Sequence, residues 1–279
     1  AFRLRTLPLS LSSILLGSFL AFRDGIFSWP VFILASLTTL FLQILSNLAN
    51  DYGDSQNGVD NKYRIGPQRA VQSGRIKARE MRLMVFAFVL LALVSGSWLV
   101  IIGTRGIGNL FTAGYLLAGF AAIAAAIKYT VGKNPYGYQG LGDLFVFIFF
   151  GLIGVGGTYF LHTNHFPADI LLPASSVGLL SAGVLNLNNM RDRLSDERSG
   201  KRTLAVLLGK HRVKIYHLVL LSASILLGTI YTIMHFKSLY QFSFLATLPL
   251  LFRNIREVMI NTIPAELDPE LKKLALATL

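Results

Sequence analysis

The sequence predicts an all-α membrane protein, a polytopic bundle of transmembrane helices, and three observations lead to this prediction. Hydrophobic residues make up 53% of the 279-residue chain and charged residues only 14%, whereas water-soluble domains average about 25% charged residues. The mean hydropathy is +0.56. The apolar residues gather in eight stretches, most of them near the ~20 residues with which an α-helix crosses a bilayer. We therefore treat residues 1–279 as a single transmembrane domain.

The eight apolar stretches are the predicted spans, and polar segments separate most of them. In chain order they cover residues 7–22, 27–48, 83–102, 110–127, 144–161, 170–187, 215–235 and 239–252. No small-residue cleavage site follows the first stretch before the next apolar run begins, so we interpret it as a span and not as a secretory signal peptide. A Gly-rich turn at 103–108 joins the third and fourth spans. From Leu271 the sequence is typical of the start of a ninth span, which we expect to be truncated.

The basic residues orient these spans in the membrane. If Arg3 and Arg5 lie inside, every Lys and Arg except Arg23, Arg105 and Lys237 falls in an inside segment, which satisfies the positive-inside rule. The net charge of +12 therefore reflects topology, and we expect no nucleic-acid partner. We predict an integral protein of the bacterial cytoplasmic (inner) membrane, with its active site on the cytoplasmic side.

The chain contains no Cys, which excludes a disulfide framework, a thiolate metal site and a Cys nucleophile. Five histidines show no metal-ligand spacing that meets the acidic motifs described below. We assign no role to them; they are His162, His165, His211, His217 and His235.

A polar helix face closes the second predicted span. Asn47, Asn50, Asp51 and Asp54 recur at i, i+3, i+4 and i+7, which places them on one side of a helix. A carboxylate costs ~2.5–3.5 kcal/mol at the centre of a bilayer and less near its edge, so two neighbouring aspartates there need a cavity or a cation. We interpret this face as an ion or substrate site; the alternative is a solvated helix end that is acidic.

A second copy of the pattern closes the sixth span, where Asn189, Asp192 and Asp196 share a helix face. Two acidic helix ends that face each other can hold divalent cations between them. Mg²⁺ is usually bound by one or two carboxylates together with substrate phosphates. We therefore predict a magnesium-bridged diphosphate site. Its predicted metal ligands are Asp51, Asp54, Asp192 and Asp196.

Basic and amide side chains beside these motifs are candidates for diphosphate contacts, because Arg and Lys donate to phosphate oxygens. Gly66 and Pro67 mark a turn that presents cations, and Gly200 precedes another basic run. The alternative is that the cations only set topology. The predicted diphosphate-binding residues are Asn50, Lys62, Arg64, Arg69, Lys128, Asn189 and Lys201.

The segment between the fourth and fifth spans is dense in Gly and Tyr, and Asp143 follows it at the start of the fifth span. Such a loop suits an aromatic substrate. Tyr136 and Tyr138 fit an aromatic belt at the membrane interface equally well.

These motifs resemble those of a known family. Asn50-Asp51-x-x-Asp54 and Asp192-x-x-x-Asp196-x-x-x-Gly200 are similar to the two aspartate-rich motifs of the UbiA-type intramembrane prenyltransferases, and the resemblance covers essentially the whole chain. Many members carry a third aspartate where this chain has Gly58, with Asp60 two residues later. The departure indicates the MenA branch, the 1,4-dihydroxy-2-naphthoate polyprenyltransferases of menaquinone synthesis. Three further segments also resemble that branch: Gly66-Pro67-Gln-Arg69-Ala70, Gly140-Leu-Gly142-Asp143 and Asn188-Asn189-Met-Arg191-Asp192.

The resemblance implies nine transmembrane helices around a cavity that the two motifs cap. It implies transfer of a polyprenyl group from polyprenyl diphosphate to 1,4-dihydroxy-2-naphthoate, with loss of CO2, giving demethylmenaquinone and diphosphate. Mg²⁺ on the aspartates would stabilise the departing diphosphate, and apolar and aromatic walls would keep water from the allylic cation. Asp60, Asp143 and Tyr129 remain unranked candidates for a base that deprotonates the naphthol.

Two other functions remain open from the sequence. The acceptor could be 4-hydroxybenzoate or another quinone precursor, without decarboxylation. Intramembrane acids could also mark a cation-coupled transporter, but such acids lie more naturally near the bilayer midplane, on broken helices. Both motifs here fall at span ends beside basic loops, which favours a diphosphate site.

Overall fold

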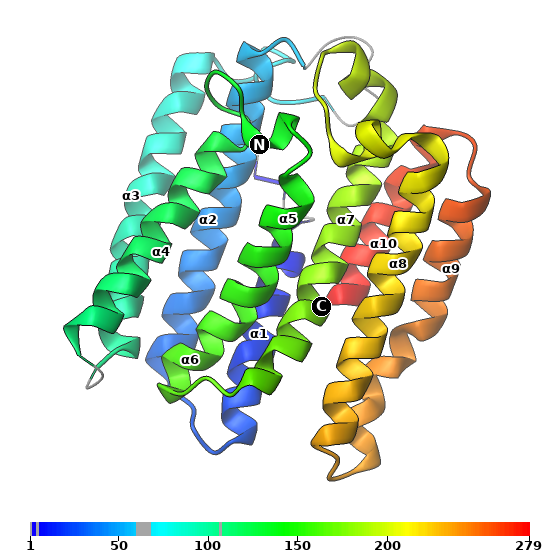
Figure 1. The fold of residues 1–279 in the computed structure, drawn as a ribbon. Helices are drawn as coiled ribbons and strands as arrows, with labels where there is room; N and C mark the ends of the chain where they lie inside the picture. The colour runs from blue at the N-terminus through cyan, green and yellow to red at the C-terminus, as the bar shows by residue number, and fades with distance from the viewer. Residues whose placement is uncertain (1, 4–5, 60–67, 106–107) are drawn as a thin grey trace.

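The computed structural model describes residues 2–3, 6–59, 68–105 and 108–279. Within these residues the chain forms helices and no strands. Figure 1 shows most of the helices running side by side along one direction. In chain order they are α1 (Leu7–Arg23), α2 (Trp29–Gln56), α3 (Ala78–Gly103), α4 (Asn109–Lys128), η2 (Tyr136–Tyr138), α5 (Gly142–Val146), η3 (Phe147–Gly157), α6 (Thr158–Thr163), η4 (Ala168–Ile170), α7 (Leu171–Arg198), α8 (Leu204–Met234), η5 (Leu239–Thr247), α9 (Leu248–Ile260), η6 (Pro264–Leu267) and α10 (Asp268–Thr278).

Six segments of the described chain are long and apolar enough to cross a membrane. They correspond to the second through seventh predicted spans and confirm them; the segments are α2, α3, α4, α5–η3–α6, η4–α7 and α8. The prediction of eight spans is not confirmed. Helix α1 has 17 residues, and the eighth predicted span is the 3-10 helix η5 followed by the 13-residue α9. The ninth predicted span corresponds to the 11-residue α10.

Helices α2 and α7 carry the two aspartate motifs, and each is 28 residues long. Helix α2 begins where the Ser28 hydroxyl accepts from the Val31 N–H, with Pro30 in its first turn, a position that proline tolerates. A 28-residue helix is about 42 Å long, whereas the hydrocarbon core of a bilayer is ~30 Å thick. The last turns of both helices therefore extend past the apolar region, and the motifs lie in those turns.

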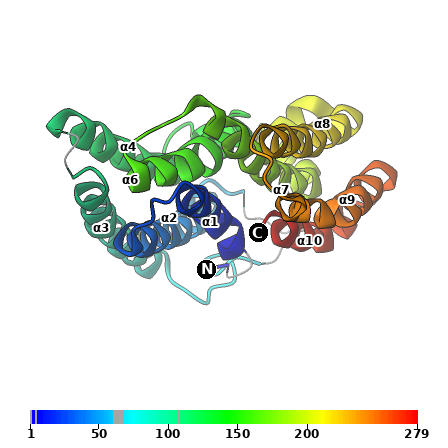
Figure 2. The ribbon, with the colours of Figure 1, turned by 90° about the horizontal axis from the view of Figure 1, so that it is seen from below.

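The helices form two groups with α1 and the α5–η3–α6 segment between them, as Figure 2 shows. One group contains α2, α3 and α4, and the other contains α7, α8, α9 and α10. Segment η3 crosses α7 at two glycines: a Cβ on Gly151 would lie 2.6 Å from the Ala174 carbonyl oxygen and 2.8 Å from the Gly178 Cα. The backbones therefore touch at this crossing, and any side chain there would separate them.

Large apolar side chains cover the outer faces of the long helices. Leu110 is 84% exposed, Leu83 68%, Val94 67% and Trp98 58%. A water-soluble surface seldom carries so many large apolar groups together. This outer surface suits contact with lipid chains, and the chain is an integral membrane protein.

Candidate functional site

Both aspartate motifs lie at the same end of the bundle, which is the upper end in Figure 1. Helices α2 and α7 continue through the motifs without a break. The four aspartates are buried, with exposures of 2% for Asp51, 1% for Asp54, 5% for Asp192 and 4% for Asp196. A buried carboxylate is costly unless charged or hydrogen-bonding groups compensate it, so the contacts of these four side chains define the site.

Arg69 joins the two aspartates of the first motif. Its guanidinium lies 3.0 Å from Asp51 Oδ1 and 2.7 Å from Asp54 Oδ2, and Arg69 itself is only 8% exposed. Arg3 adds a third ion pair, with its Nη2 2.7 Å from Asp51 Oδ1. The structure thus places the predicted Arg69 at the first motif. It also adds Arg3, to which the sequence assigned only a topological role.

Arg191 is the arginine that pairs with an acid of the second motif. Its Nε and Nη2 donate to the two carboxylate oxygens of Asp192 over 3.0 and 2.8 Å. The same guanidinium donates to Asn188 and forms an ion pair with Asp268 at the start of α10. Arg191 is 1% exposed, and the sequence analysis gave it no role. An arginine inside a buried helix implies a carboxylate partner, and this signal would have found it.

Lys201 and Tyr138 connect the two motifs. The Tyr138 hydroxyl donates a 2.6 Å hydrogen bond to Asp54 Oδ1, and its carbonyl oxygen accepts from the Arg202 N–H at 3.1 Å. The Lys201 ammonium lies 5.3 Å from the centre of the Tyr138 ring, within the ~6 Å of a cation–π contact, and 3.7 Å from Asp196 Oδ1. The structure thus places the predicted Lys201 beside the second motif, and Tyr138 belongs to the site.

The loop that carries Tyr138 packs directly on the first motif. The Thr130 hydroxyl lies 3.1 Å from Asn50 Oδ1 and donates to the Ala49 carbonyl. A Cβ on Gly53 would lie 2.5 Å from the Thr130 carbonyl oxygen, so only a glycine between Asp51 and Asp54 admits this contact. The predicted residue Asn50 therefore holds the loop in place.

Tyr129 and Asp143 lie behind this loop. Burial is the main cause that raises the pKa of the Tyr129 hydroxyl above its usual range, and the charges of Asp143, Asp54 and Asp196 contribute. Tyr129 is therefore within electrostatic reach of both motifs. Asp143 is 4% exposed, and neither of its carboxylate oxygens has a hydrogen-bond partner in the described part of the chain. The Tyr216 hydroxyl of α8 lies close enough to interact with this carboxylate.

The remaining predicted site residues are Asn189, Lys128, Asp60, Lys62 and Arg64. Asn189 is buried on α7 beside the second motif. Lys128 is exposed at the end of α4, and no hydrogen bond or ion pair joins it to either motif within the ranges described above. Asp60, Lys62 and Arg64 lie outside the described residues.

The aspartates fit a divalent cation by their chemistry. As the side chains stand, no three His, Asp or Glu groups among residues 2–3, 6–59, 68–105 and 108–279 are arranged to bind a metal. The predicted ligands are nevertheless carboxylates, the hard oxygen donors that Mg²⁺ prefers. Asp51 and Asp54 also face one point, because a single cationic group, Arg69, contacts both. The site therefore offers positions that suit a cation.

Comparisons with known proteins agree with this arrangement. Residues 10–262 match the UbiA prenyltransferase family. The chain is 44% identical to 1,4-dihydroxy-2-naphthoate octaprenyltransferase of Haemophilus influenzae, over 99% of this chain and 90% of that protein. It is 41% identical to the Escherichia coli protein of the same name, over 97% and 87%. A UbiA homolog from Archaeoglobus fulgidus, bound to GPP and Mg2+, superposes with a TM-score of 0.62 at 18% identity, over 100% of this chain and 98% of that one.

The family match covers most of the chain, and the two bacterial relatives are similar over nearly their full length. The Archaeoglobus structure shares the fold. The chain belongs to the UbiA prenyltransferase family and, within it, to the same branch as these naphthoate prenyltransferases.

Proposed function

We propose that this protein transfers a polyprenyl group from polyprenyl diphosphate to 1,4-dihydroxy-2-naphthoate, with release of CO2 and diphosphate. A bond forms between the allylic carbon and the ring carbon that carries the carboxylate. The allylic C–O bond and the ring–carboxylate bond break, and the product is a prenylated naphthoquinol, the reduced form of demethylmenaquinone. The names of the two bacterial relatives support this acceptor.

The observation that carries the proposal is the link between two acidic motifs on different helices. Tyr138 contacts Asp54 of the first motif, and Lys201, which lies over its ring, contacts Asp196 of the second. Acids that face one another beside basic side chains suit a ligand with several negative charges and accompanying cations. Diphosphate is such a ligand.

We further propose that Asp51, Asp54, Asp192 and Asp196 hold Mg²⁺; the Mg2+ bound to the Archaeoglobus relative supports this assignment. When bound, the ion would neutralise charge on the departing diphosphate. Arg69, Arg3 and Lys201 pair with these acids in the structure and would donate to the diphosphate oxygens when the ion binds the carboxylates. Their positive charges would stabilise the charge that develops on diphosphate.

Asp143 is our candidate for the group that accepts the naphthol proton. Both of its carboxylate oxygens lack partners in the described chain, so they can accept a hydrogen bond from a substrate hydroxyl. Tyr129 is a poor base because its raised pKa keeps it protonated. We propose that it donates a hydrogen bond instead. This ranking leaves Asp60, which lies outside the described residues, as the remaining candidate.

An aromatic row beside Asp143 would protect the allylic cation from water. The Tyr129 and Tyr136 rings lie 5.4 Å apart, Tyr136 and Phe145 4.2 Å, and Phe145 and Phe149 6.1 Å between centroids. Aromatic faces attract cations within ~6 Å. The row runs from the loop into η3, so it leads from the motif end toward the membrane interior.

We propose that the motif end faces the cytoplasm. The basic side chains concentrate in the segments at that end, as the positive-inside rule requires of cytoplasmic segments. We also retain α1 and the η5–α9 segment as additional crossings, because each lies beside the long helices and its outer side chains are apolar, Phe19 and Phe252 among them.

The test uses the protein in membranes with octaprenyl diphosphate, Mg²⁺ and carboxyl-labelled 1,4-dihydroxy-2-naphthoate. Released labelled CO2 and lipid-extractable product are measured together. We expect equal amounts of both, and neither with Asp54→Asn. Glu197→Gln is the matched control, since Glu197 is an exposed acid on α7 outside the site.

A different result would redirect the proposal. Prenylated product from 4-hydroxybenzoate, with no CO2 from the naphthoate, would keep the family and change the acceptor. No product from either acceptor would refute the proposal. The transporter alternative has no support from the helices, because α2 and α7 are unbroken at the motifs.

A further inference from the structure

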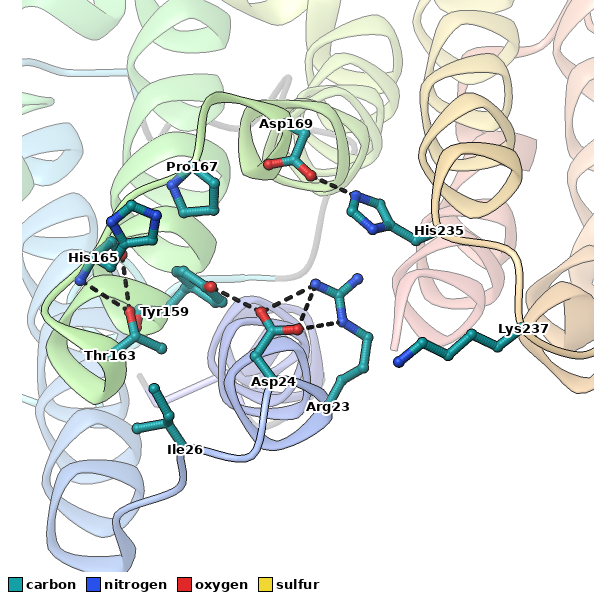
Figure 3. Close-up of a pocket in the computed structure, with 10 residues that line it drawn as sticks. All are labelled: Arg23, Asp24, Ile26, Tyr159, Thr163, His165, Pro167, Asp169, His235 and Lys237. Carbon is teal, nitrogen blue, oxygen red and sulfur yellow. Dashed lines mark hydrogen bonds and ion pairs between the residues drawn. The ribbon is translucent and has the colours of Figure 1, made fainter.

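A polar cavity lies at the end of the bundle opposite the aspartate motifs. Its volume is about 390 Å³, and its lining comes from the α1–α2 turn, the α6–η4 segment and the α8–η5 turn (Figure 3). From Trp29 to Asp51, α2 rises about 33 Å, and the cavity residues Asp24 and Ile26 precede Trp29. The cavity is therefore on the membrane face opposite the aspartate motifs, and the proposed reaction does not use it.

The cations of this face are concentrated in the cavity. The predicted topology leaves only three basic residues on this side, Arg23, Arg105 and Lys237, and two of them line the cavity. The positive-inside rule gives no reason for Lys and Arg on this side. Two such residues at one site, from segments more than 200 positions apart, indicate a local role.

Two hydrogen-bonded pairs of side chains form the frame of the cavity. Arg23 donates to both carboxylate oxygens of Asp24, over 2.8 and 3.0 Å, and to the Tyr231 hydroxyl of α8 over 2.6 Å. The Tyr159 hydroxyl donates to Asp24 over 2.8 Å, and His235 pairs with Asp169. Asp24 and Asp169 thus each have a hydrogen-bond partner on another side chain.

Two further side chains remain available to a ligand. The Lys237 ammonium and the His165 imidazole have no hydrogen-bond or ion-pair partner within the described chain, and both are exposed. In Figure 3 the Lys237 side chain extends toward Arg23 and the cavity. The Lys237 ammonium is therefore a cation of the cavity that no carboxylate contacts within the described chain. A ligand that carries a negative charge suits it.

Apolar side chains adjoin the cavity and indicate where such a ligand comes from. Ile26 lines it and is 46% exposed. Phe22, Phe166 and Phe236, each next in sequence to a lining residue, are 65%, 41% and 54% exposed. Aromatic and apolar side chains beside charged ones are typical of a membrane–water interface. A free anion gains nothing from these apolar side chains, whereas a lipid can place its acyl chains against them.

We propose that the cavity binds the phosphodiester headgroup of a membrane lipid. Lys237, with His165 and the outer edge of the Arg23 guanidinium, donates to the phosphate oxygens, and the acyl chains lie along Ile26 and the flanking phenylalanines. Because Arg23 joins α1 to Tyr231 of α8, the bound headgroup stabilises the contact of α1 with the carboxy-terminal helix group.

The test measures binding of short-chain phosphatidylglycerol to the full chain in detergent, by native mass spectrometry and by the shift in melting temperature. Diacylglycerol with the same chains lacks the phosphate and serves as the ligand control. We expect phosphatidylglycerol to bind and Lys237→Glu to weaken that binding at least tenfold. Arg105→Glu makes the same change of charge on the same membrane face, but outside the cavity. We expect this variant to bind phosphatidylglycerol as the parent protein does.

Each other outcome overturns the proposal. Equal binding of diacylglycerol, unchanged binding in Lys237→Glu, or equal losses in Lys237→Glu and Arg105→Glu would refute a phosphate site in the cavity. Displacement of the lipid by inorganic phosphate at equal concentration would assign the cavity to a free anion. His165→Ala is a second variant, and we expect it also to weaken binding of phosphatidylglycerol. The His165 imidazole makes no hydrogen bond or ion pair within the described chain, so its removal should not disturb folding. Binding is measured without turnover, and the outcome is independent of the proposed prenyl transfer.

Discussion

The hydroxyl of Tyr138 lies 2.6 Å from Asp54, while its ring lies under Lys201 of the second motif. One side chain therefore fixes the spacing between two acidic clusters on helices that are far apart in the sequence. Burial raises the pKa of Tyr138 above its usual range, and the charge of Asp54 adds to the effect. The phenol thus stays protonated and remains a donor to Asp54.

Replacing Tyr138 with Phe removes this hydrogen bond and keeps the ring. A hydrogen bond to a charged group contributes ~1.5–3 kcal/mol, so we expect kcat/KM for the prenyl diphosphate to fall about 10- to 100-fold. Steady-state kinetics with each substrate varied in turn would measure this. Tyr136→Phe is the matched control, since that hydroxyl donates to the Ala125 carbonyl. Equal effects in both variants would contradict a specific role for Tyr138.

Asp192→Asn should abolish turnover and leave the protein folded, because it removes a proposed metal ligand but retains an amide oxygen that accepts from Arg191, which also keeps its ion pair with Asp268. We expect at least a 100-fold loss of kcat, about 2.7 kcal/mol or more, with an unchanged elution profile in detergent. Chelation of Mg²⁺ should inactivate the parent enzyme reversibly. Activity that persists in excess chelator would refute metal-assisted departure of diphosphate.

Arg69→Ala should raise KM for prenyl diphosphate more than KM for the naphthoate. Arg69 contacts both acids of the first motif, and Arg is suited to paired phosphate oxygens. Arg75→Ala, a change at an exposed cation of the same segment, is the control. The reverse pattern of KM changes would place Arg69 at the acceptor.

Arg191→Met should destabilise the protein strongly, since it leaves Asp192 buried without its guanidinium partner. Removing one member of a buried ion pair costs about 3–5 kcal/mol. The melting temperature in detergent measures the loss. Arg193→Met tests the specificity, because Arg193 forms an i,i+4 pair of 3.7 Å with the exposed Glu197 and no other ion pair within the described residues, and it should change the melting temperature little.

The stability of the protein should fall at alkaline pH. Burial is the main cause that raises the pKa of Tyr129, Tyr136 and Tyr138 above the ordinary value of 10.0. Below that pH both the folded and unfolded states keep these protons. As the pH rises through about 10, the unfolded chain loses them first, so the free energy of unfolding decreases with pH. Melting temperatures between about pH 9 and 11 should fall less steeply in Tyr129→Phe, and an identical slope would contradict this account.

The central spans could be predicted from sequence because long apolar runs specify membrane helices directly. The first and eighth were harder to assign. Helix α1 is short, and the eighth predicted span begins as a 3-10 helix and is followed on α9 by Arg253 and Arg256, so its apolar run ends early. Both lie beside longer helices, and packing rather than hydropathy determines their extent.

The four aspartates could be predicted because helical periodicity is a local signal. Their partners could not. Tyr138 and Asp54 are 84 residues apart, and Arg191 and Asp268 are 77 apart. Such contacts depend on how the helices pack, and no spacing in the sequence records them. The same reason explains why Arg3 was predicted only as a marker of topology.

Arg69 gives the site a further property. Because its guanidinium lies between Asp51 and Asp54, the acids are compensated in the absence of any ligand, and the chain can fold before metal or substrate arrives. Under the proposed function, binding would be an exchange of partners, in which the arginine would move from carboxylate to phosphate as cations bind the carboxylates. The site would stay close to electroneutral at each stage, so a highly charged diphosphate could approach the membrane edge without meeting an equally charged site.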